Sequence, residues 1–134
     1  MTSFGDGSLR QVRTPTTWDA ASGVLSISVS TTDADTVWVA YFAPYSYEQH
    51  QGLIAQCQGA LDHDGSALCA VESIGQSLDG RDIDLITTGT GPTTCWVVAR
   101  QHPGESMAEW WADGFLGRLL DKDDEIARSI RSIA

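Results

Sequence analysis

One stretch decides the fold of this chain: Cys95-Trp96-Val97-Val98-Ala99-Arg100-Gln101-His102-Pro103-Gly104-Glu105-Ser106. Its first five residues include no strongly polar side chain, which predicts a central strand buried on both faces. A Pro-Gly corner follows, and the period of apolar residues becomes helical from Ser106. The imidazole of His102 and the carboxylate of Glu105 are therefore expected where a sheet ends and a helix begins. Ligands usually bind at that place in an open α/β fold.

His102 and Glu105 are predicted to be two ligands of a catalytic Zn²⁺ ion. Imidazole nitrogen and carboxylate oxygen are both good zinc donors, and a Pro-Gly corner lets the two side chains face one point. The plainer alternative is an exposed histidine beside a glutamate that the helix dipole favours. No convincing third ligand follows from the sequence, because His50 and His63 are both interpreted as surface histidines. Glu109 is in the position of a general base, but an exposed helical glutamate is the more common meaning.

The composition favours one ordinary globular region without nucleic-acid partners. The chain has 134 residues, with 18 acidic and 8 basic side chains and a formal net charge of -10. Such a surface repels phosphate backbones. Its three cysteines are an odd number without a disulfide-like pattern, so a reducing compartment is expected, and the lack of a C-x-x-C pair argues against a thiolate zinc site. With no signal pattern and no apolar stretch long enough to span a bilayer, the chain is predicted to be cytoplasmic, with no membrane contact.

The rest of the chain predicts short strands first and a mixed α/β pattern afterwards. Alternating apolar and polar residues, or short apolar runs, indicate a β-meander over residues 9–13, 24–30 and 36–42. A helix is expected over 45–57, with Ser46 as N-cap and Gln49 at its third position. A hairpin is expected from strands over 68–74 and 83–87, joined by an Asp79-Gly80 turn. Two helices are expected after it, one from residue 106 and one from residue 123 or 124.

Three ordered motifs then carry a resemblance to a known family. They are Ala40-Tyr41-Phe42-Ala43-Pro44-Tyr45-Ser46-Tyr47, Ile74-Gly75-Gln76-Ser77-Leu78-Asp79-Gly80-Arg81-Asp82-Ile83-Asp84-Leu85 and Ala99-Arg100-Gln101-His102-Pro103-Gly104-Glu105-Ser106-Met107-Ala108-Glu109-Trp110. With these motifs the chain resembles the M14-type zinc metallocarboxypeptidases. Within that group it is similar to the cytosolic carboxypeptidase branch, which includes tubulin deglutamylases and many bacterial proteins.

The resemblance implies both a fold and a division of the chain. The expected class is α/β, with a mixed central sheet and helices that form an incomplete carboxypeptidase-like domain. Residues 1–42 would be the C-terminal part of an N-terminal β-sandwich, and residues 43–134 the N-terminal part of the catalytic domain. His102 and Glu105 correspond to zinc ligands of the family. Arg81 matches a family position whose role is expected to be structural, pinning the turn by hydrogen bonds.

The resemblance also implies what this sequence lacks. The family takes its third zinc ligand, a histidine, its Asn-Arg clamp for the substrate carboxylate and its general-base glutamate from regions further downstream. This chain contains no Asn, and it is expected to be an inactive fragment without a catalytic residue of its own. The whole enzyme would hydrolyse the C-terminal residues of peptides or proteins. Two alternatives stay open, a zinc acylase of related fold and a non-catalytic interaction module. Self-association through exposed core surfaces is also expected.

Overall fold

A computed structural model of the chain describes residues 2–4, 9–11, 15–28 and 39–134. The chain divides into two compact units, Met1–Pro44 and Tyr45–Ala134. That the first range belongs to a β-sandwich and the second to a catalytic domain stays a prediction.

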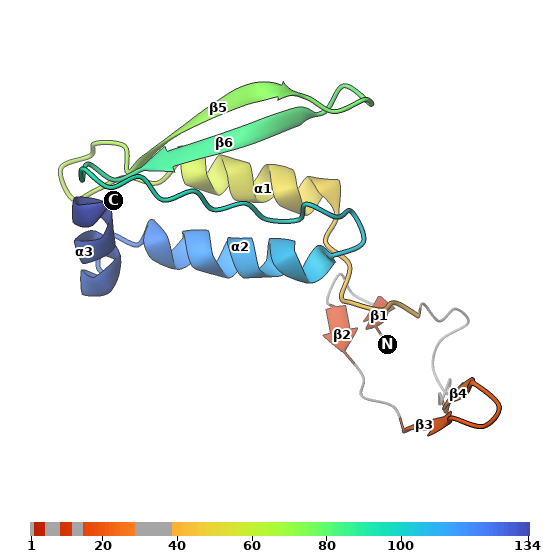
Figure 1. The fold of residues 1–134 in the computed structure, drawn as a ribbon. Coiled ribbons are helices and arrows are strands. Elements are labelled where there is room, and N and C mark those ends of the chain that lie inside the picture. Colours follow the sequence, from red (N-terminus) through yellow and green to blue (C-terminus); the bar gives the residue numbers. More distant parts are fainter. Residues whose placement is uncertain (1, 5–8, 12–14, 29–38) are drawn as a thin grey trace. The chain divides into compact units, whose positions relative to one another are not determined.

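The described residues of the first unit form two antiparallel strand pairs (Figure 1). β1 (Thr2–Phe4) pairs with β2 (Leu9–Gln11), and β3 (Thr16–Asp19) pairs with β4 (Val24–Ile27). At the β3–β4 turn, the Asp19 carboxylate accepts a hydrogen bond from the Ala21 amide at 2.9 Å. The strands predicted over 9–13 and 24–30 are confirmed where they are described, but their predicted arrangement in one β-meander is wrong for the described residues, because β2 pairs with β1 and β4 pairs with β3 in separate sheets. Part of the strand predicted over 36–42 lies outside the described residues, and residues 39–42 form no strand.

The second unit begins with α1 (Tyr47–Gln58), which starts as the sequence predicts. The Ser46 hydroxyl accepts a hydrogen bond from the Gln49 amide at 3.2 Å, and the Gln49 side chain accepts one from the Ser46 amide at 2.7 Å. This reciprocal capping box satisfies two backbone donors that a helix start leaves unpaired. Leu53 and Cys57 are buried on this helix, and α1 packs against the hairpin that follows.

The hairpin consists of β5 (Cys69–Gln76) and β6 (Asp82–Thr88), paired antiparallel with a register shift between Ser73 and Gly75. Its turn uses the predicted Asp-Gly pair, and Gly80 has a φ of 73°, which favours glycine. Figure 1 shows the hairpin with α1 beneath it and α2 beside α1. Both the predicted helix and the predicted hairpin are confirmed.

Two helices complete the described chain, α2 (Ser106–Leu119) and α3 (Glu125–Ile133). The Asp124 carboxylate caps α3 by accepting a hydrogen bond from the Ala127 amide at 2.9 Å. From α3, the buried Arg131 guanidinium donates to the carbonyls of Leu119 and Asp121 at the end of α2. A cation placed there satisfies orphan carbonyls and complements the helix dipole.

The predicted central strand over residues 95–99 is not observed as a strand. The segment runs between the hairpin and α2 without a ladder of hydrogen bonds (Figure 1). Trp96 and Val98 are 77 % and 65 % exposed, and Cys95, expected in the core, is exposed as well. Sequence periodicity detects apolar character, but a strand also needs a neighbouring strand to accept its hydrogen bonds. In the described part of the chain β6 pairs with β5 and no strand pairs with this segment.

The α/β class itself is confirmed, since the described residues include three helices and small antiparallel sheets. Each sheet of the described residues has two strands, so the expected larger mixed sheet is not present among them. None of the described helices is long and apolar enough to cross a bilayer.

Candidate metal-ligand turn and its supports

The two predicted zinc ligands lie at opposite ends of one tight turn. The Glu105 amide donates a hydrogen bond to the His102 carbonyl at 3.0 Å, which closes the chain around Pro103 and Gly104. Such a closure brings the first and fourth residues of a turn close together. The Pro-Gly corner thus makes the predicted sharp turn, and the convergence of the two side chains on one metal ion stays a prediction.

Both side chains leave their donor atoms available. Glu105 is the N-cap residue of α2, yet its carboxylate makes no capping hydrogen bond. His102 is exposed, and its ring has no hydrogen-bond partner among the described residues. An imidazole and a carboxylate fit zinc as two members of a ligand set. No group of three or more His, Cys, Asp or Glu that could hold a metal occurs within the described ranges.

Arg100 holds the turn from one side. Its guanidinium donates from Nε and Nη2 to the Pro103 carbonyl, both at 3.2 Å, and from Nη1 to the Tyr45 carbonyl at 3.1 Å. Its backbone has a φ of 52°, a left-handed conformation that costs about 1–2 kcal/mol for a residue with a side chain. Strain of this kind persists only where surrounding contacts impose it. The guanidinium contacts therefore stabilise a backbone geometry that aims the chain into the turn.

A cluster of His50, Asp84 and Glu109 joins α1, β6 and α2. His50 Nδ1 lies 2.7 Å from Glu109 Oε1, and His50 Nε2 lies 3.0 Å from Asp84 Oδ2. The three side chains are 28 %, 19 % and 11 % exposed, in the order His50, Asp84 and Glu109. The interpretations of His50 as a surface histidine and of Glu109 as an exposed glutamate were therefore wrong.

The environment of His50 favours its charged form. Burial by itself lowers the pKa of the imidazole, but the hydrogen bonds to Glu109 and then to Asp84 outweigh it, so the pKa is raised. A cation between two carboxylates is the arrangement that stabilises an imidazolium.

Tyr45 provides a second link from the start of α1 to α2. Its hydroxyl lies 3.1 Å from Asp113 Oδ2, and its ring meets Trp110 edge-to-face with centroids 4.9 Å apart. The tyrosine is 4 % exposed, and burial, followed by the hydrogen bond to Asp113, raises the pKa of its phenol well above the ordinary value.

A helical periodicity in the sequence could have revealed these links. His50 precedes the buried Leu53 by three residues and the buried Cys57 by seven, so it lies on the buried stripe of α1. The sequence could not show which groups face that stripe, since Asp84 and Glu109 come from two other elements.

Other predicted residues agree with their expected roles in different degrees. His63 is a surface residue, with its side chain 59 % exposed and Nε2 3.4 Å from an Asp123 oxygen. Arg81 pins the hairpin turn through its main chain, because its amide donates to the Ser77 hydroxyl at 3.1 Å and its carbonyl accepts from the Ser77 amide at 2.8 Å. Its guanidinium instead lies over the ring of Tyr47, 4.4 Å from the centroid.

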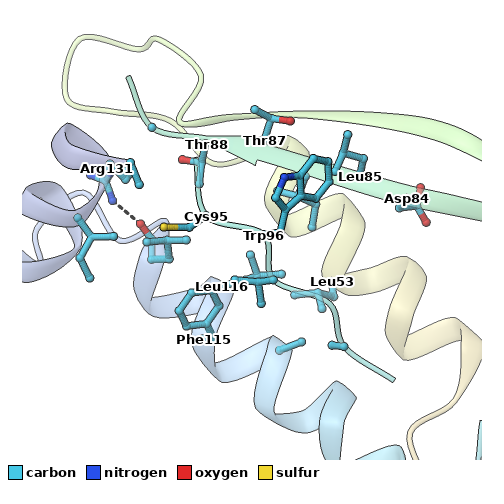
Figure 2. Close-up of a pocket in the computed structure, with 18 of the residues that line it drawn as sticks. Leu53, Asp84, Leu85, Thr87, Thr88, Cys95, Trp96, Phe115, Leu116 and Arg131 are labelled. Atoms are coloured by element: carbon cyan, nitrogen blue, oxygen red, sulfur yellow. Dashed lines mark hydrogen bonds between the residues drawn. The ribbon is translucent and has the colours of Figure 1, made fainter. Parts of the chain in front are cut away.

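An apolar cavity of about 570 Å³ lies between β6, the segment over residues 95–99 and α2 (Figure 2). Figure 2 shows Leu53, Leu85, Trp96, Phe115 and Leu116 around it. Trp111, which also lines the cavity, stacks on Phe115 with ring centroids 4.9 Å apart. Neither His102 nor Glu105 lines this space, so it is distinct from the proposed metal-ligand turn.

Comparison with known proteins shows the family that the chain resembles. A metallo-carboxypeptidase from Burkholderia cenocepacia superimposes with a TM-score of 0.71 and 34 % identity, covering 90 % of this chain. The resemblance to the metallo-carboxypeptidases is confirmed. Cytosolic carboxypeptidase 2 from Mus musculus is 31 % identical over 112 residues, 75 % of this chain. An uncharacterized protein from Zymomonas mobilis is 44 % identical over 116 residues, 87 % of this chain.

The chain spans only part of these proteins. It corresponds to 32 % of the Burkholderia chain, 29 % of the Zymomonas protein and 12 % of the mouse carboxypeptidase. No family model matches the chain. The similarity establishes a carboxypeptidase-like fold over most of the residues present, whereas the activity of the longer relatives comes to this chain only as a proposal.

Proposed function

We propose that this chain supplies two zinc ligands, His102 and Glu105, of a metallocarboxypeptidase that hydrolyses the C-terminal residues of peptides or proteins. The observation that carries the proposal is the closed turn at the start of α2, which presents an exposed imidazole and a carboxylate that makes no capping hydrogen bond. The similarity of the whole chain to metallo-carboxypeptidases supports the same proposal. The names of the cytosolic relatives support a cytoplasmic location.

A bound zinc ion would polarise the scissile carbonyl and lower the pKa of an attacking water toward ~7. The residues of this chain would hold and orient that ion. Arg100 keeps the turn closed, and the helix that begins at Ser106 carries the Glu105 carboxylate on a rigid element. The third ligand, the clamp for the substrate carboxylate and the general base are proposed to come from residues that correspond to the additional length of the relatives. The 134 residues alone are therefore proposed to be inactive as a peptidase.

Zinc titration followed by NMR of the histidine side chains tests this proposal. Added Zn²⁺ should shift the ring nitrogen signals of His102, and the shift should vanish in Glu105→Ala at the same zinc concentration. Two protein ligands hold zinc only weakly, so the test depends on which histidine responds to zinc and not on a high affinity. His63→Ala is the matched control, since that histidine is also exposed, and it should leave the His102 response unchanged. A response confined to His63 or His50 would reject the assignment.

A non-catalytic module that associates with itself is the second candidate. The exposure of Trp96 and Val98 favours it, together with a 53 % exposed Trp111. Large apolar side chains that are exposed together usually mark an interface. We propose that these residues drive self-association of the isolated chain. Sedimentation velocity should show dimers or larger species that Trp96→Ser reduces, and a stable monomer at high concentration would contradict this.

A further inference from the structure

The cluster of His50, Asp84 and Glu109 has no role in the proposed zinc site as described so far. Both ring nitrogens of His50 face carboxylate oxygens at hydrogen-bonding distance, Glu109 at 2.7 Å and Asp84 at 3.0 Å. Ionised carboxylates only accept hydrogen bonds, and a neutral imidazole has a single N–H donor. With both carboxylates ionised, the two contacts can be satisfied together only by the imidazolium, which donates from both nitrogens.

The cluster acts on the beginning of α2. Glu109 lies in the first turn of this helix, four residues after the N-cap Glu105, so the two share one helix face. A helix is rigid over such a distance, and holding Glu109 against α1 holds the end from which Glu105 projects. The next residue on that face, Asp113, is also tied to the α1 side through Tyr45.

The turn itself has a third tie to the same place. Arg100 joins the Pro103 carbonyl, inside the turn, to the Tyr45 carbonyl, two residues before α1 begins. Hydrogen bonds thus connect the metal-ligand turn and the first turns of α2 to His50 in α1 and to Tyr45, two residues before this helix. Among them, only the His50 contact also reaches the sheet, through Asp84 of β6.

We propose that His50 is a positioning residue, whose imidazolium pins the start of α2 to β6 and thereby sets the orientation of Glu105 and His102. The proposal rests on the proposed function for its consequence in zinc binding. Its structural half, the ordering of residues 102–105, does not depend on zinc.

The stabilisation that the His50 imidazolium provides depends on pH. Among the described residues, the charged groups that face His50 are Glu109 from α2 and Asp84 from β6. The ring of Tyr47, on the same helix as His50, stacks on the imidazole with centroids 6.2 Å apart. Because the pKa of His50 is raised, its contribution is complete below the ordinary histidine pKa and is lost as the pH rises through the raised value.

Hydrogen exchange of the Glu105 amide, without metal, tests the structural half. This amide closes the turn, and His50→Gln should speed its exchange about tenfold through loss of a charge-assisted hydrogen bond. Cys57→Ala, a substitution of another buried α1 residue, controls for general destabilisation and should change this exchange much less. If His50→Gln folds poorly, Glu109→Gln keeps the shape, removes one charge and should give the same result. Equal exchange in the His50 or Glu109 variant and in Cys57→Ala would overturn the proposal.

Zinc binding tests the consequence and separates the two claims. The dissociation constant for the zinc-dependent shift of His102 should rise by about 10-fold in His50→Gln, as is usual for a residue that orients a ligand. The exposed His63→Gln should leave it unchanged. If wild-type His102 gives no zinc response, the proposed function fails, while the exchange measurement still decides the role of His50. Unchanged zinc affinity in His50→Gln would overturn the positioning of the ligands.

Discussion

At Arg100, substitution by glycine should lower the free energy of unfolding less than substitution by alanine. Its left-handed backbone, with a φ of 52°, disfavours every residue that has a Cβ, whereas glycine adopts it freely. In Arg100→Ala the guanidinium contacts to the Pro103 and Tyr45 carbonyls are lost and the strain stays. In Arg100→Gly the same contacts are lost and the strain is relieved.

The size of the difference follows from the contacts. Three hydrogen bonds of 3.1–3.2 Å from a half-exposed guanidinium contribute about 2 kcal/mol together, the lower part of the range for such bonds. Arg100→Ala should therefore lower the free energy of unfolding by about 2 kcal/mol. Relief of about 1–2 kcal/mol of backbone strain, less about 0.5–1 kcal/mol for the greater flexibility of glycine in the unfolded chain, should leave Arg100→Gly only about 1 kcal/mol below the wild type.

Urea unfolding followed by tryptophan fluorescence measures both variants. Gln101 provides the matched control, because it is exposed and has no positive φ. At that position glycine should be less stable than alanine, by about 0.5–1 kcal/mol, since its unfolded chain is more flexible. The opposite order at two neighbouring residues would identify the strained backbone as the cause. An Arg100→Ala protein as stable as Arg100→Gly would refute the reasoning.

Three further predictions concern the helix start, a close approach and pH. Ser46→Ala should reduce the free energy of unfolding by about 1 kcal/mol through loss of the α1 capping box, while Ser129→Ala on exposed α3 surface should change it little. Gly91→Ala should cost about 1–3 kcal/mol in chemical denaturation, because a Cβ there would collide with the main chain of Ile133. Raising the pH from about 6 to about 9 should lower the melting temperature as His50 loses its proton, and His50→Gln should weaken that dependence. A pH profile identical in the two proteins would contradict the assigned charge.

Local patterns predicted the elements that local interactions stabilise. Ser46 and Gln49 cap α1, Gly80 turns the hairpin, and Asp124 starts α3, because each of these depends on residues within a few positions along the chain. The turn between His102 and Glu105 belongs to the same group. Its closure needs only the Pro-Gly corner and one main-chain hydrogen bond.

Tertiary structure alone decided what surrounds these elements. The apolar run from 95 to 99 was predicted as a buried strand, but burial and pairing depend on neighbours, and Trp96 is largely exposed in this chain. His50 has a helical position that the sequence shows, whereas its two carboxylate partners lie 34 and 59 residues away. Periodicity identifies a face of a helix, and only packing determines which charges meet there. The charge of His50 is therefore a property of the fold, although the residues that carry the proposed zinc ligands can be recognised along the chain.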